Sequence, residues 1–233
     1  MKKTITKIAL FVITCITVIS CSITKDLNKG NLILRSNEIF VNGSKVKTDS
    51  LSPLLAQKKN NYIIGFPLTA KLHQSSKENS DSIFNKWINK KVKRKKRLIS
   101  ILSKKQVLQL NSYYENLNNW KKKNGEKLEI IDSVKTNISI ENLKSYYNNN
   151  GYFNSKISSK TIINQNNNKF GKVVYNIKTG NQYALDSVST NIESKVLESI
   201  FNSENNKSIL KPNTFFNTKK FELERNRINK LFK

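Results

Sequence analysis

The chain has few of the residues that build disulfides, metal sites or nucleophilic centres. Its 233 residues include two cysteines and one histidine, His73. Cys15 lies inside an apolar run and Cys21 ends it, so a chain cleaved before Cys21 retains no pair of thiols for a disulfide. A lone histidine predicts no metal site, and we expect no cofactor. Because the sequence also lacks a Gly-rich phosphate loop and a nucleophile with a nearby base, we expect no enzymatic activity.

Acidic residues are also scarce. The chain has 16 Asp and Glu against 42 Lys and Arg, which gives a net charge of +26. Residues 1–20 carry three lysines and no acid, so their removal leaves +23. This balance is typical of proteins that meet nucleic acid or an anionic membrane surface. We interpret it mainly as a solvated surface that attracts anionic lipid headgroups, because the N-terminal residues predict export and because abundant Lys, Asn and Ile are also expected of an AT-rich genome.

The N-terminal residues predict export. Three lysines precede an uncharged, mostly apolar run, residues 8–19, and Val18, Ile19 and Ser20 lead directly into Cys21. Twelve residues are too few for a transmembrane helix, which needs about 20. The layout resembles the lipobox of bacterial lipoproteins, which implies cleavage before Cys21 and acyl chains on its thiol and amine. An ordinary signal followed by an incidental cysteine is the alternative.

The residues after Gly30 predict a strand that ends at a turn, followed by a helix. Apolar residues from Leu32 to Leu34 and from Ile39 to Val41 predict strand structure, and Asn42-Gly43 is a strong turn signal. We then expect a helix that is capped by Thr48 or Asp49 and that ends at Asn60. Its apolar face would consist of Leu51, Leu54 and Leu55.

A long basic region, residues 77–127, follows a polar break. Apolar residues at helical spacing, such as Phe84, Trp87 and Ile88, predict helices on both sides of a basic run. The run consists of Lys90, Lys91, Lys93, Arg94, Lys95, Lys96 and Arg97. We interpret it as a solvated helix face or hinge, or as a surface that contacts lipid phosphates or an acidic partner.

The clearest unit lies between Ser139 and Gly180. We expect Ser139 to cap a helix that ends before Gly151, with Leu143, Tyr146 and Tyr147 on one face. Residues 152–163 and 170–179 then predict two antiparallel strands of a layered α+β unit. After Gly180 the pattern restarts, and Ile228, Leu231 and Phe232 repeat the positions of Leu143, Tyr146 and Tyr147. We therefore expect a second unit that stops before its own hairpin.

Three segments of this unit resemble the polypeptide-transport-associated (POTRA) domains of outer-membrane assembly factors. They are Asn150-Gly151-Tyr152-Phe153, the strand residues 173–177, and the crossing segment 180–188. Together with the lipobox they are most similar to the lipidated, translocation-and-assembly-type members of the BamA-like superfamily. The resemblance implies an α+β fold of βααββ units, one complete with a helical insertion and one truncated. The family's C-terminal barrel has no counterpart before Lys233, so a truncated gene and a short lipoprotein are both open.

The resemblance also implies a domain plan and a location in the outer membrane, facing the periplasm. The expected segments are a signal peptide at 1–20, a lipid-attached tether at 21–30, a POTRA-like domain at 31–181 with its insertion at about 77–127, and the start of a second repeat at 182–233. Its partners would be unfolded outer-membrane client proteins or an assembly partner. The family pairs clients with a sheet edge.

Here the implied pairing residues are Tyr152, Phe153, Ile157, Val173, Tyr175 and Ile177, and no side-chain motif selects one strand. Two alternatives stay open. One is a stand-alone envelope lipoprotein whose basic region binds anionic lipid or glycan. The other is a nucleic-acid-binding protein, which would show a DNA affinity that depends steeply on salt and an intracellular pool. The export signal argues against that pool, so we expect no nucleic-acid partner.

Overall fold

The computed structural model describes residues 23–24, 27–47, 50–63 and 67–233. The chain forms a mixed α+β structure that divides into two compact units. The first comprises Met1–Arg35, Lys59–Ile130 and Gln165–Phe170, and the second Ser36–Lys58, Ile131–Asn164 and Gly171–Lys233. Cys21, Thr48 and Asp49 lie outside the described residues.

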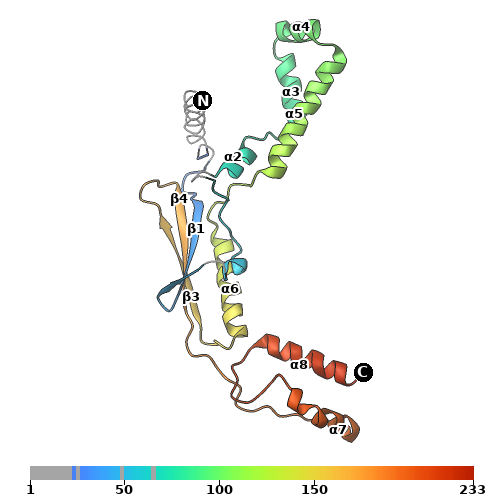
Figure 1. The fold of residues 1–233 in the computed structure, drawn as a ribbon. Coiled ribbons are helices and arrows are strands. Elements are labelled where there is room, and N and C mark those ends of the chain that lie inside the picture. The colour runs from blue at the N-terminus through green and yellow to red at the C-terminus, as the bar shows by residue number, and fades with distance from the viewer. Residues whose placement is uncertain (1–22, 25–26, 48–49, 64–66) are drawn as a thin grey trace, which may run out of the picture. The chain divides into compact units, whose positions relative to one another are not determined.

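The α+β fold class predicted from the sequence is confirmed. The structure contains an open four-stranded sheet with the strand order β2-β1-β4-β3 (Figure 1). Its strands are β1 (Ile33–Val41), β2 (Ser44–Val46), β3 (Lys156–Ile163) and β4 (Phe170–Lys178). β1 and β2 are antiparallel, and so are β3 and β4. β1 runs parallel to β4, because the Ile33 N–H donates to the Lys169 carbonyl at one end and the Asn42 N–H donates to the Ile177 carbonyl at the other.

The turn between β1 and β2 confirms the sequence prediction. Asn42 and Gly43 both take positive φ angles, 49° and 85°. Two successive residues with positive φ form the tight turn whose twist matches a hairpin. Asn42 also ties β1 to the end of β4, since its Oδ1 accepts from the Thr179 N–H at 3.1 Å and its Nδ2 donates to Thr179 Oγ1 at 3.0 Å.

Helix α6 (Ser133–Asn149) packs along the sheet, as Figure 1 shows. Its N-cap is Asp132, whose carboxylate accepts from the backbone N–H groups of Val134 and Lys135. The predicted cap at Ser139 is therefore wrong. Ser139 lies inside the helix, where its hydroxyl donates to the Lys135 carbonyl at 2.8 Å and accepts from the Ala56 N–H at 3.0 Å. A buried hydroxyl used in this way satisfies backbone groups of two segments.

The helix predicted up to Asn60 does not form. Only a 3-10 turn, η1 (Ser52–Leu54), occurs in the described residues there, and the chain continues in irregular structure. Hydrogen bonds to α6 and its cap replace those of a helix: Asn142 Nδ2 donates to the Leu54 carbonyl at 2.9 Å, and Gln57 Oε1 accepts from the Asp132 N–H at 3.2 Å. Tertiary partners therefore override a weak local helix signal.

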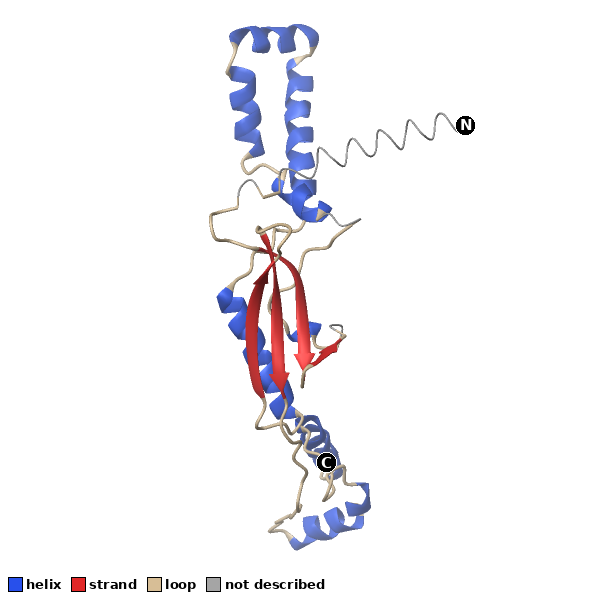
Figure 2. Ribbon diagram, turned by 90° about the vertical axis from the view of Figure 1, so that its left-hand side faces the viewer, coloured by secondary structure: helices blue, strands red, loops and turns tan. Residues whose placement is uncertain are grey.

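The first unit contains α2 (Leu68–Gln74), α3 (Ser80–Asn89), α4 (Val92–Ile101) and α5 (Lys104–Asn124). α3 and α5 lie side by side, and α4 runs across their ends (Figure 2). α5 begins with a capping box, in which Ser103 and Gln106 each bind the other's backbone N–H. A small apolar cluster around Ile33 and Ala70 packs against Leu128 and Phe170.

The end of the second unit contains α7 (Lys195–Ser203), η2 (Asn205–Lys207) and α8 (Thr218–Leu231). Between Gly180 and α7 the chain forms one isolated bridge in the described residues, between Ala184 and Phe215. α8 is capped by Asn217, whose side chain accepts from the Lys219 N–H at 3.0 Å. Among the described helices, none combines the length and the apolar character that a bilayer-spanning segment requires.

Candidate functional site: the open edge of the sheet

β3 forms an edge of the sheet, whereas β4 lies between β1 and β3. The backbone of β4 is therefore paired on both sides. Its side chains Val173, Tyr175 and Ile177 are buried in the core. Of the two strands that the sequence offered for client pairing, only β3 has unpaired backbone in the described sheet.

The hydrogen bonds of β4 show which groups of β3 point outward. The carbonyls of Lys169 and Ile177 accept from β1, so the odd-numbered residues of β4 direct their backbone groups to β1. The even-numbered residues consequently face β3. Because Val174 is opposite Lys160 and Asn176 is opposite Ser158, the even-numbered residues of β3 bond to β4. The outward-facing N–H and C=O groups of β3 belong to Ile157, Ser159, Thr161 and Ile163.

The side chains of β3 leave this backbone accessible. Most residues of the strand are exposed, and Ile157 is half-buried. Ser159 and Thr161, at the centre, are small. The strand contains neither proline nor glycine, and its eight residues extend over about 26 Å. Lys156 and Lys160 are its only charged residues. Lysines on an edge strand are a common means of limiting self-association.

Tyr152 and Phe153 do not lie on the strand. β3 begins at Lys156, so the predicted strand start at Tyr152 is wrong. The Tyr152 N–H donates to the Tyr147 carbonyl at 2.9 Å, and their rings meet edge to face with centroids 5.7 Å apart. The Phe153 ring packs on Phe216 and Tyr183, at 5.0 Å and 5.6 Å between centroids. Helix termination and aromatic packing thus hold these residues in a turn before β3.

Gly151 allows the backbone at Tyr183 and Phe216 to lie close to this turn. Its φ is +83°, which confirms the predicted left-handed position after α6. A Cβ at Gly151 would lie 3.1 Å from the backbone oxygens of Tyr183 and Phe216. The Tyr183 N–H donates to the Gly151 carbonyl at 2.9 Å, and the Phe216 N–H donates to the Tyr183 carbonyl at 2.9 Å. The start of β3 is therefore anchored to the segment that leads into α8.

The short strand β2 forms the other edge of the sheet, next to β1. Glu38 of β1 links the strands there, with Lys45 Nζ at 2.8 Å and Lys172 Nζ at 2.9 Å from its two oxygens. The hydrogen bonds from Lys45 and Lys172 lower the pKa of the Glu38 carboxyl. The Glu38 carboxylate thus joins three strands, β1, β2 and β4.

The side chains of the basic run, residues 90–97, do not all face the same way. Lys93, Lys95, Lys96 and Arg97 are exposed on the helix, and Lys90 and Lys91 precede it, also exposed. Arg94 points the other way: its guanidinium carbon lies 4.5 Å from the centroid of the Trp87 ring, and Nη1 donates to the Trp87 carbonyl at 2.6 Å. Spacing alone did not reveal this difference, because it depends on the rotation of α4 against α3.

No cluster of three or more His, Cys, Asp or Glu side chains that could hold a metal occurs in the described residues. His73, which the sequence left without a role, lies half-buried in α2. The arrangement therefore offers a row of backbone donors and acceptors at β3 and a cationic helix surface at α4.

A comparison with curated proteins finds no match for this chain. A comparison with protein families matches residues 35–180 to the POTRA family, described as a surface antigen variable number repeat. The match covers more than half of the chain. POTRA domains are non-catalytic scaffolds of the periplasm that bind polypeptides or partner proteins in outer-membrane assembly. The predicted resemblance is thereby confirmed at the level of the domain, and the chain belongs to the POTRA family.

Proposed function

We propose that this chain is a lipid-anchored scaffold of the BamA-like, translocation-and-assembly type, which takes up extended client polypeptides by pairing them with β3. The observation that carries the proposal is the open edge of β3. Its outward backbone groups, from Ile157 to Ile163 at every second residue, match the donors and acceptors of an extended chain.

Strand addition suits clients of many sequences. Each backbone hydrogen bond contributes about 1 kcal/mol net, whatever the client's side chains are. A client that pairs along β3 adds these contributions and also covers the small side chains of Ser159 and Thr161. Lys156 and Lys160 disfavour pairing of the edge with a second copy of itself, because their charges would meet like charges.

The anchor is supported by the sequence alone, because Cys21 lies outside the described residues. Acyl chains on Cys21 would hold the chain at a membrane, since two chains suffice for stable attachment. The location that we propose is the outer membrane, with the POTRA domain in the periplasm. Replacing Cys21 by serine should abolish palmitate labelling in cells and release the protein from the membrane fraction.

The pairing is tested by proline substitution at one outward-facing position. Ser159→Pro removes an N–H that points away from β4 and leaves the β3–β4 ladder in place. As the probe we would use a fluorescent synthetic peptide with the alternating apolar pattern of an outer-membrane strand, and measure its affinity by anisotropy. We expect affinity to fall about fivefold or more, as for the loss of one hydrogen bond or two.

The matched control is Ser159→Ala, which removes the hydroxyl and keeps the N–H. It should bind the peptide as the parent does. Hydrogen exchange of β4 amides reports whether the sheet stays intact in both variants. Equal peptide affinity of the proline and alanine variants, with an intact sheet, would overturn pairing at β3.

A further inference from the structure

The surface of α4 combines a dense positive charge with outward apolar side chains. The segment between Asp81 and Glu115 contains ten basic residues and no acidic one. They are Lys86, Lys90, Lys91, Lys93, Arg94, Lys95, Lys96, Arg97, Lys104 and Lys105. An uncompensated field of this size attracts an anionic partner.

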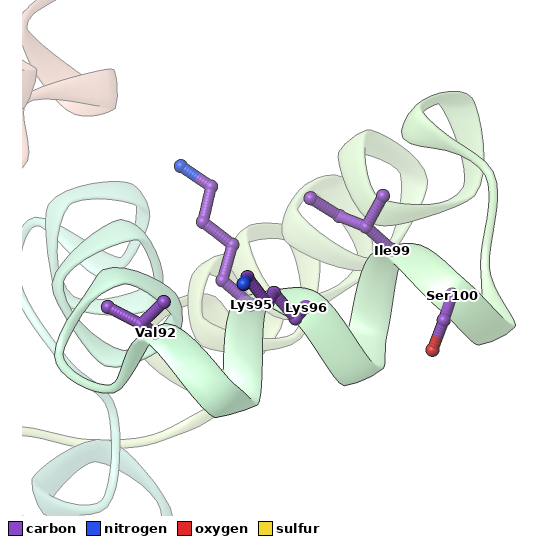
Figure 3. A pocket seen from close by; sticks show the side chains of 5 residues that line it. All are labelled: Val92, Lys95, Lys96, Ile99 and Ser100. Carbon is purple, nitrogen blue, oxygen red and sulfur yellow. The ribbon is translucent and has the colours of Figure 1, made fainter.

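One face of α4 exposes two apolar side chains, those of Val92 and Ile99. Val92 and Ile99 are 71% and 46% exposed. Figure 3 shows Val92, Lys95 and Ile99 projecting from the same side of the helix, with Ser100 on another side. Together with Lys96 they line an open hollow of about 460 Å³. Val92 and Ile99 are seven residues apart, two turns of helix, so they form a short apolar stripe between lysines.

The opposite face fixes the rotation of α4. Arg94 is held on Trp87 by a cation–π contact of 4.5 Å and by its hydrogen bond to the Trp87 carbonyl. Leu98, one turn further along, is half-buried. The helix therefore cannot turn Val92 and Ile99 inward without giving up these contacts.

We propose that α4 rests on a bilayer surface that carries anionic lipid headgroups. The lysines contact the headgroups, while Val92 and Ile99 enter the boundary between headgroups and acyl chains. Lysines that flank an apolar stripe suit this position, because their alkyl stems lie along apolar surface while the ammonium groups stay in water. A nucleic acid would meet the charge and leave the stripe exposed, so the stripe favours a bilayer. This contact is independent of client pairing at β3.

The test uses the full chain with Cys21→Ser, so that no acyl chain contributes. Binding is measured by cosedimentation with vesicles of phosphatidylcholine alone and with vesicles that also contain phosphatidylglycerol. We expect binding that depends on phosphatidylglycerol and weakens as salt rises. The vesicles of phosphatidylcholine alone report any binding through the apolar N-terminal run.

Three exposed lysines of α4 supply the charge variant: Lys93→Glu, Lys95→Glu and Lys96→Glu together. Each cation near an anionic surface strengthens binding about fivefold, so the variant should lose about a hundredfold or more. The matched control reverses three exposed lysines beyond this segment, Lys122, Lys123 and Lys127, for the same change in net charge. It should lose much less.

A second variant, Val92→Ser with Ile99→Ser, keeps every charge and removes the stripe. It should weaken binding to the anionic vesicles severalfold and leave binding to a short DNA duplex unchanged. An equal loss of vesicle affinity in the two charge variants would overturn the proposal, because binding would then depend on net charge alone. DNA or acidic polysaccharide binding as tight as vesicle binding, with no effect of the serine variant, would also overturn it.

Discussion

Glu224 and Arg227 form a two-point ion pair on α8, with Nη2 2.7 Å from Oε1 and Nε 3.0 Å from Oε2. The same carboxylate accepts from Ser208 Oγ and from the Ile209 N–H, each at 2.9 Å. Glu224 is buried, so a single carboxylate joins α8 to the loop after η2. A buried carboxylate with this many donors is held in its charged form.

We first predict that the pair makes the second unit sensitive to acid. The hydrogen bond from Arg227, more than any other contact, lowers the pKa of Glu224 from 4.5 to about 2. A carboxyl whose pKa is lowered by folding contributes stability above its unfolded pKa, and this contribution disappears as pH falls from about 4.5 toward 2. The loss is about 3 kcal/mol in the free energy of unfolding.

Hydrogen exchange of the α8 amides, recorded at increasing urea concentrations across this pH range, measures the stability of the C-terminal segment. Glu224→Gln should flatten the pH dependence. Glu222→Gln, an exposed site on the same helix, should leave it as in the parent. An unchanged pH profile in Glu224→Gln would contradict the assignment.

A second prediction compares two glycines with similar backbone angles. Gly43 and Gly151 have φ of +85° and +83°, but a Cβ meets nothing within 4 Å at Gly43 and two backbone oxygens at 3.1 Å at Gly151. Gly43→Ala should therefore cost only the left-handed conformation, about 1 kcal/mol. Gly151→Ala should cost about 3 kcal/mol, because the turn must also move. Thermal unfolding monitored by far-UV circular dichroism distinguishes the two variants. Equal losses of stability would show that the turn at Gly151 moves without cost, which would contradict the prediction.

A third prediction concerns Asn60, a buried amide of the first unit. Its Nδ2 donates to the Lys127 carbonyl at 2.8 Å, and its Oδ1 accepts from the Glu129 N–H at 2.8 Å. Asn60→Ala leaves both backbone groups without this partner and should cost about 2 kcal/mol. Both tryptophans lie in this unit, so urea unfolding followed by tryptophan fluorescence reports it. The control, Asn61→Ala, keeps the exposed backbone bond to Glu126 and should cost well under about 1 kcal/mol.

The fourth prediction tests the rotation of α4. Arg94→Ala removes the cation over the Trp87 ring and should shift the emission of Trp87, measured in a Trp120→Phe background where it is the only tryptophan. The stacking contributes about 0.5–1 kcal/mol at a partly exposed site. Lys93→Ala, which removes a charge from the same helix, should leave the emission unchanged. A shift of equal size in both variants would mean that charge, not the contact, sets the emission.

Local signals predicted the elements whose geometry is local. The Asn42-Gly43 turn, the glycine that follows α6 and the strand β4 all formed where they were expected, because backbone preference and alternation act within a few residues. The helix near Leu51–Asn60 failed because Ser139, Asn142 and Asp132, more than 70 residues away, supply hydrogen bonds to a non-helical chain. No local pattern encodes such partners.

The sequence by itself determined the family, whose model matches residues 35–180, and it determined the positive charge of the insertion. The BamA-like type, the lipid on Cys21 and the clients stay predictions. Only the tertiary structure decided which strand has a free edge and which cations face outward. Strand order depends on pairing between β1 and β4, more than 130 residues apart, and the outward face of α4 depends on the contact of Arg94 with Trp87. The first contact joins distant parts of the chain, and the second depends on how α4 is rotated against α3, so neither follows from spacing along the chain.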